Sequence, residues 1–138
     1  MKIVGFNFNK INIEKLSDKV DNLKINTDID ISEIKEIKSD FFKTKEDIIT
    51  VKFSYNINYE PNFAKIEFVG NVLLAIESKT TKNILKQWKD KKMSEEFKIT
   101  LFNIILRKSN LKALQLEDEI NLPLHISLPS LKQKEKEQ

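Results

Sequence analysis

The sequence predicts an α+β fold, a four-stranded antiparallel sheet followed by a short helix and then a long one. Apolar and polar residues alternate through much of the first 76 positions, which is the period of a strand with one buried face. After residue 76 the apolar spacing lengthens to three and four residues, which is helical. With 138 residues, 40% of them hydrophobic, the chain fits one domain. We expect residues 1–131 to form it and 132–138 to be a charged, disordered tail.

The first two strands are predicted at Lys2–Glu14 and Leu23–Ile37. In the first, the alternation changes phase between Phe8 and Ile11, and a phase slip of one residue is what a β-bulge produces. The second loses its phase near Ile34, so we expect that end to be irregular or bulged. A charged loop is expected from Ser39 to Asp47.

The clearest pair of strands lies between Asp47 and Ile76. Glu60-Pro61-Asn62 supplies a turn, because Pro fixes its own φ and Asn tolerates turn geometry. Two β-rich runs flank this turn, so the sequence predicts a long antiparallel hairpin whose apolar face needs a covering layer. In the first run the apolar residues fall at every second position: Ile49, Val51, Phe53, Tyr55, Ile57 and Tyr59.

Two helices are predicted next. Ser78–Lys91 has a lysine-rich outer face, and Ser94 is a suitable N-cap for a long helix with Glu95 and Glu96 in its first turn. The apolar arc of the long helix is too wide for one sheet to cover, which favours burial on two sides and therefore self-association. The residues that we expect in an oligomer interface are Phe97, Leu101, Phe102, Ile104, Ile105 and Lys108.

The segment Asn121–Pro129 is apolar but interrupted by two prolines, so it is neither a helix nor a central strand. Its apolar residues belong to no periodic element in which they would be buried. They are candidates for an exposed binding surface: Leu122, Leu124, Ile126 and Leu128.

The residues that usually carry chemistry are scarce. There is no cysteine, and the single histidine, His125, is expected to be a half-exposed loop residue, which excludes a multi-histidine metal centre within one chain. Gly5 and Gly70 are isolated, so no phosphate-binding loop is present. The acidic run 117–119 is interpreted as solvated surface, as are Asp28 and Asp30. We therefore expect no enzyme, no cofactor and no metal.

The sequence also bears on two other classes of partner, nucleic acids and membranes. Six lysines surround Trp88 and could follow phosphates, but a solvated amphipathic helix is the favoured interpretation, and we expect no nucleic-acid partner. No apolar run approaches the ~20 residues of a membrane-spanning helix. The N-terminus lacks the apolar core of a signal peptide. The expected location is the cytoplasm.

In chain order, four segments resemble the SecB family of export chaperones. Leu23–Asp30 looks like the second strand of the family, and Lys65–Val72 like the fourth. Phe102–Arg107 is similar to the start of the dimerising helix face, and Asn121–Leu124 to the segment that follows that helix. The lysine-rich run 78–93 departs from the family, which carries a glycine- and proline-rich segment there.

The resemblance implies an ATP-independent holdase that assembles as a dimer of dimers and binds unfolded clients in apolar grooves. Ile25, Thr27 and Ile29 match family positions associated with client binding, and Phe68 is a weaker candidate; packing within the oligomer is the alternative for each. Binding to the motor SecA is doubtful, because only Glu67 has a counterpart among the acidic contacts of the family. The alternative function is a dedicated interaction module, such as the chaperone or antitoxin partner of a toxin–antitoxin system.

Overall fold

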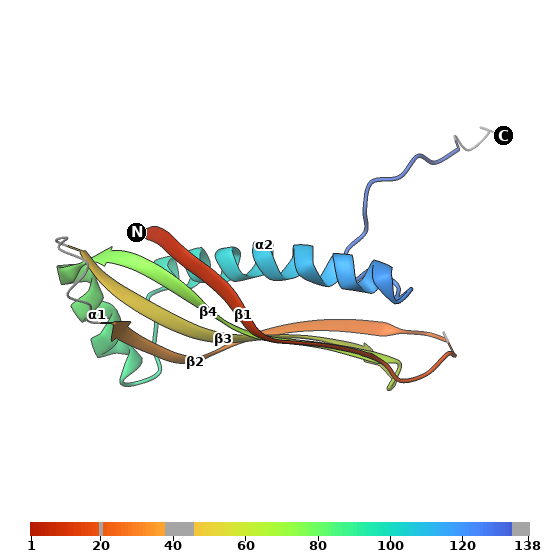
Figure 1. Ribbon diagram of the computed structural model, residues 1–138, viewed down its shortest axis with the longest axis horizontal. Coiled ribbons are helices and arrows are strands. Elements are labelled where there is room, and N and C mark those ends of the chain that lie inside the picture. Colours follow the sequence, from red (N-terminus) through yellow and green to blue (C-terminus); the bar gives the residue numbers. More distant parts are fainter. Residues whose placement is uncertain (20, 38–45, 134–138) are drawn as a thin grey trace.

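A computed structural model of the chain describes residues 1–19, 21–37 and 46–133 (Figure 1). Four strands precede two helices, as the sequence predicts, and the predicted α+β class is confirmed. Most of the predicted loop at 39–47 and most of the tail lie outside the described residues. The elements are β1 (Lys2–Lys15), β2 (Lys24–Ile37), β3 (Glu46–Glu60), β4 (Ala64–Glu77), α1 (Ser78–Trp88) and α2 (Glu95–Glu119).

The sheet is antiparallel, with the order β1-β4-β3-β2, so the predicted hairpin forms its centre and the first two strands form its edges. The bulge predicted near Phe8 is present as a register shift between Phe8 and Lys10, and a second shift follows Ile3. In β2 the shift falls between Ile31 and Glu33, near the predicted irregular end. Both edge strands therefore bend away from the regular ladder.

Gly70 has a packing role that its isolation in the sequence did not reveal. It lies opposite Phe53 in the register of β3 and β4. A Cβ atom at this position would lie 2.8 Å from Cζ of Phe53 and against the backbone oxygen of Asn7. The centre of the sheet therefore accepts only glycine here without moving a ring or a strand.

Helix α2 covers the apolar face of the sheet (Figure 1). It begins as predicted, because the Ser94 hydroxyl accepts a hydrogen bond from the backbone N–H of Phe97 at 3.3 Å. Helix α1 ends at Trp88, three residues before the predicted end at Lys91. The residues of α2 that face the sheet recur at every fourth position: Phe97, Leu101, Ile105, Ser109, Ala113 and Glu117.

Candidate functional site

The candidate site is built at the end of the sheet where β2 begins. Ile25 and Ile29 lie directly opposite Tyr59 and Tyr55 of β3, with Thr27 between them. Partners in a ladder project on the same face, so these β2 side chains share the face on which α2 packs. Ile25 and Ile29 are half-buried and Thr27 is exposed. The three predicted residues thus line the outer edge of the apolar face.

The segment that follows α2 lies over the same two tyrosines. The Tyr59 hydroxyl donates a hydrogen bond to the carbonyl oxygen of Pro123 at 2.5 Å. The Tyr55 hydroxyl lies 3.2 Å from Nε2 of His125. Because Ile25 and Ile29 flank these tyrosines on β2, the structure brings the strand candidates and the start of the segment, through Pro123 and His125, to one end of the sheet.

The apolar residues of this segment differ in accessibility. Leu122 is buried, and its backbone N–H donates to the carbonyl oxygen of Glu117 at 2.8 Å. Leu124 is half-buried, whereas Ile126 and Leu128 are 39% and 56% exposed. We call Leu124, Ile126 and Leu128 the ledge. Leu122 instead anchors the segment to the core.

Phe68 is placed differently from the other candidates. It is fully buried beneath α2, and its ring stacks on Tyr55 with a centroid separation of 5.5 Å and an interplanar angle of 11°. Within one chain it supports the Tyr55 ring and presents no surface of its own.

A buried polar cluster joins the segment to α2 and β3. Nδ1 of His125 lies 2.6 Å from Oε2 of Glu117, and the backbone N–H of His125 donates to Oε1 at 2.9 Å. Nε2 lies 3.0 Å from Oδ1 of Asn110, which also accepts from the Tyr55 hydroxyl at 2.6 Å. Since Nδ1 faces a carboxylate, it carries a proton. Polar atoms therefore lie within hydrogen-bonding distance of both ring nitrogens.

The sequence interpretation was wrong for two members of this cluster. His125 as a whole is half-buried, but its side chain is only 3% exposed, whereas an exposed ring was implied by the expected half-exposed loop residue. Glu117 is fully buried, whereas its neighbours Asp118 and Glu119 are exposed as expected for an acidic surface run. No local signal distinguished Glu117, except that it continues the every-fourth-residue series that faces the sheet.

The environment of Tyr55 and Tyr59 favours the protonated hydroxyl, which can donate a hydrogen bond. Burial raises the pKa of Tyr55 well above its ordinary value, and the negative charge of Glu117 raises it further. The pKa of Tyr59 is raised first by burial, then by the charge of Glu117 and a side-chain hydrogen bond with it, and last by Tyr55. Both residues thus stay protonated at neutral pH.

The candidates for an oligomer interface divide into two groups. The side chains of Phe97, Leu101 and Ile105 already pack on the sheet of their own chain. Phe102 and Ile104 are half-buried and Lys108 is exposed, so these three remain accessible. The outer side of α2 also exposes Ile99 and Leu111. A pocket of about 540 Å³ lies between this helix and β1, lined by Ile3, Thr100, Asn103, Ile104, Arg107 and Lys108.

No protein-family model matches the chain, and neither does any curated protein. Among solved structures, the chain is similar to the Mycobacterium tuberculosis SecB-like chaperone Rv1957, determined in complex with a ChAD peptide from the Rv1956 HigA1 antitoxin. The match covers 97% of this chain and 92% of that chain, with a TM-score of 0.50 and 10% sequence identity. The fold is SecB-like. At this identity the likeness is one of fold.

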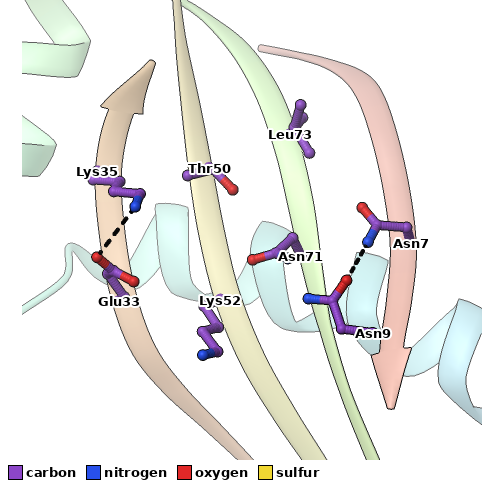
Figure 2. A pocket seen from close by; sticks show the side chains of 8 residues that line it. All are labelled: Asn7, Asn9, Glu33, Lys35, Thr50, Lys52, Asn71 and Leu73. Carbon is purple, nitrogen blue, oxygen red and sulfur yellow. Dashed lines mark hydrogen bonds and ion pairs between the residues drawn. The ribbon is translucent and has the colours of Figure 1, made fainter. Parts of the chain in front are cut away.

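The SecB-like sheet also has an open face with a polar pocket of about 320 Å³ (Figure 2). Residues that lie side by side on the four strands form it in two rows. One row runs from Asn7 through Asn71 and Lys52 to Glu33, and the other from Gly5 through Leu73 and Thr50 to Lys35. Lys35 pairs with Glu33 at 3.7 Å, and the Asn7 amide donates to Asn9 at 2.6 Å. The lining has a single carboxylate, that of Glu33. It comprises Asn7, Asn9, Glu33, Lys35, Thr50, Lys52, Asn71 and Leu73.

The described residues contain neither a metal-ligating cluster nor a membrane-spanning helix. Nowhere in residues 1–19, 21–37 or 46–133 do three His, Cys, Asp or Glu side chains gather as they would around a metal ion. Within the same ranges, no helix is both long enough and apolar enough to cross a membrane.

Proposed function

We propose that this chain is an ATP-independent, cytoplasmic holdase that binds unfolded or non-native polypeptides. The observations that carry the proposal are the accessible apolar residues on a SecB-like fold: Ile25 and Ile29 at the edge of the sheet, and the ledge on the segment that follows α2. An unfolded chain offers apolar side chains at irregular intervals, and a long shallow surface accommodates many such sequences.

The edge of β2 gives this surface a second means of binding. Among the described strands β2 pairs only with β3, so one side of its backbone is available to an extended polypeptide. Backbone hydrogen bonds at a sheet edge do not depend on the client's sequence, and apolar contacts to Ile25 and Ile29 add affinity. This combination favours a broad range of clients.

We also propose that the chain assembles as a dimer of dimers through the outer side of α2. Phe102, Ile104 and Lys108 are the accessible members of the predicted interface, and the pocket between α2 and Ile3 adjoins them. Apolar residues exposed on a helix are stabilised when a second copy covers them. We do not propose transfer of clients to a SecA-type motor, since only Glu67 has a counterpart among the acidic contacts of the family.

The second candidate function is a dedicated chaperone in a toxin–antitoxin system. It is supported by the similar structure, in which a SecB-like chaperone binds an antitoxin peptide. A general holdase protects several unrelated proteins, whereas a dedicated module protects one partner. Neither function assigns catalysis or a bound cofactor to the chain.

The experiment is suppression of aggregation of two unrelated unfolded proteins without ATP, after the assembly mass has been measured by light scattering. We expect a tetramer that protects both clients. The double variant Leu124→Ser and Ile126→Ser should reduce protection while leaving the mass unchanged. Ile37→Ser is the matched control, because Ile37 is 38% exposed, like Ile126 at 39%, but lies at the other end of β2. If neither client is protected, the general holdase is excluded.

A further inference from the structure

The segment 121–128 has no regular secondary structure, so side chains fix its position. Leu122 anchors its start in the core, and the Pro123 carbonyl receives the Tyr59 hydroxyl. Beyond this point the ledge residues become progressively more exposed, and Leu131 is fully exposed. The last described attachment before the exposed part of the segment is His125.

We propose that His125 is a positioning residue that locks the segment onto α2 and β3, and so fixes the direction in which the ledge leaves these two elements. The proposal deepens the proposed function, since it takes the ledge to be the surface that clients contact. It assigns a role to a buried histidine that neither the family resemblance nor the fold likeness provides.

The geometry fixes both the place and the rotation of the imidazole ring. On one side, the ring and the backbone of His125 both bind the carboxylate of Glu117, which belongs to α2. On the other side, Nε2 lies within hydrogen-bonding distance of Asn110 on α2 and Tyr55 on β3. The hydrogen bond from Nδ1 to Glu117 fixes one edge of the ring, and the close approach of Nε2 to atoms of α2 and β3 fixes the other, which leaves the ring a single orientation.

A role in positioning explains this cluster better than a role in stability. Burying the Glu117 carboxylate and the His125 ring removes both from water, and such pairs are often no more stabilising than apolar residues of similar volume. Apolar packing, however, does not specify direction, whereas a hydrogen-bonded ring does. The segment leaves the core at His125, so the direction of the chain at this residue determines where Ile126 and Leu128 project.

The first test measures the order of the segment itself. Because the chain has no cysteine, Ser127→Cys carries a single spin label at an exposed position. We expect a restricted label in this background and a mobile label when His125→Ala is added. His125→Asn retains an amide donor toward Glu117 and should restore part of the restriction. A label equally restricted with Ala at position 125 would overturn the proposal.

The second test separates positioning from stability. In the double variant Glu117→Leu and His125→Leu, the carboxylate and the imidazole are replaced together, so no buried charge is left unpaired and the fold should be retained. The backbone N–H of residue 125 loses its acceptor on Glu117 in this variant. We expect client affinity to fall about tenfold, as for His125→Ala, because the ledge loses its orientation. Recovery of normal affinity and a restricted label in this variant would show that apolar packing is sufficient and would overturn the proposal.

The two tests distinguish this inference from the proposed function. If the unmodified chain protects no client, the holdase proposal fails, whereas the spin label still decides whether His125 orders the segment. If the unmodified chain protects clients and His125→Ala binds them with undiminished affinity, the holdase proposal is retained and the positioning role of His125 is refuted.

Discussion

The hydroxyl of Tyr59 donates a hydrogen bond to the carbonyl oxygen of Pro123, 64 positions later in the chain, at a distance of 2.5 Å. This contact ties the end of the central hairpin to the segment that carries the ledge. It also satisfies a hydroxyl in a residue that is 1% exposed, so the segment shields one end of the core from water.

The first prediction concerns this contact. Tyr59→Phe keeps the ring but removes the donor, leaving the Pro123 carbonyl without it, and should lower the free energy of unfolding by about 1 kcal/mol. Amide hydrogen exchange should become faster at residue 122 and at residues 124–126, while the centre of β3 stays protected. Unchanged exchange at those residues would show that the segment is held without this bond.

The second prediction concerns alkaline pH. Burial and Glu117 raise the pKa of Tyr55 and Tyr59 above the ordinary value of 10.0, so the folded state keeps protons that the unfolded state releases. The tyrosine contribution to stability is fully present below pH 10 and is lost as the pH rises further. Above that pH each tyrosine should lower the free energy of unfolding by up to about 1.4 kcal/mol per pH unit.

The measurement is chemical denaturation between pH 8 and pH 11.5 (roughly the range that brackets free tyrosine titration). The control is the double variant Tyr55→Phe and Tyr59→Phe, whose stability should fall less steeply above pH 10 because only other groups titrate in it. Equal slopes in the two proteins would refute the assignment.

Features of the fold could be predicted from the sequence where the residues that determine them are close together in the chain. The hairpin was predicted correctly because six alternating apolar residues and a Pro-Asn turn leave one register. The bulge near Phe8 was visible as a phase slip, but the shift after Ile3 lies too close to the chain end to produce one. The helix cap at Ser94 was a local signal too.

The polar cluster was missed because its members come from three separate parts of the chain. Tyr55 belongs to the apolar series of β3, Glu117 to an acidic run, and His125 to a proline-interrupted segment. Each has an ordinary interpretation when taken alone, and acidic residues are rarely fully buried. Only the packing of α2 on the sheet brings them within hydrogen-bonding distance.

The third prediction concerns assembly. Ile104→Asp places a charge on the accessible side of α2, beside the pocket that Ile3 lines, and should lower the mass measured by light scattering. The control is Ile126→Asp, which puts the same charge on the ledge and should leave the mass unchanged. A constant mass in both variants would place the interface elsewhere.

The fourth prediction concerns Ser109, whose hydroxyl is buried in α2 with no hydrogen-bond partner among the described residues. Ser109→Ala removes the unpaired polar group and substitutes a better helix former, so the free energy of unfolding should rise by about 1 kcal/mol. Thermal denaturation should show a midpoint higher by a few degrees. A lower midpoint would mean that the hydroxyl has a partner in the folded protein.

The last prediction compares the two glycines. At Gly70 a methyl group would meet the Phe53 ring at 2.8 Å and the backbone of β1, both in the centre of the sheet, where neither can move freely. Gly70→Ala should therefore lower the free energy of unfolding by about 2 kcal/mol. At Gly5 the nearest atom to an added Cβ is the Cβ of Leu73 at 3.5 Å, which is ordinary contact. Gly5→Ala should be neutral or slightly stabilising in the same denaturant titration, because alanine restricts the unfolded chain. If both variants lose the same stability, the contacts of Gly70 with the Phe53 ring and the β1 backbone are not the reason for glycine at this position.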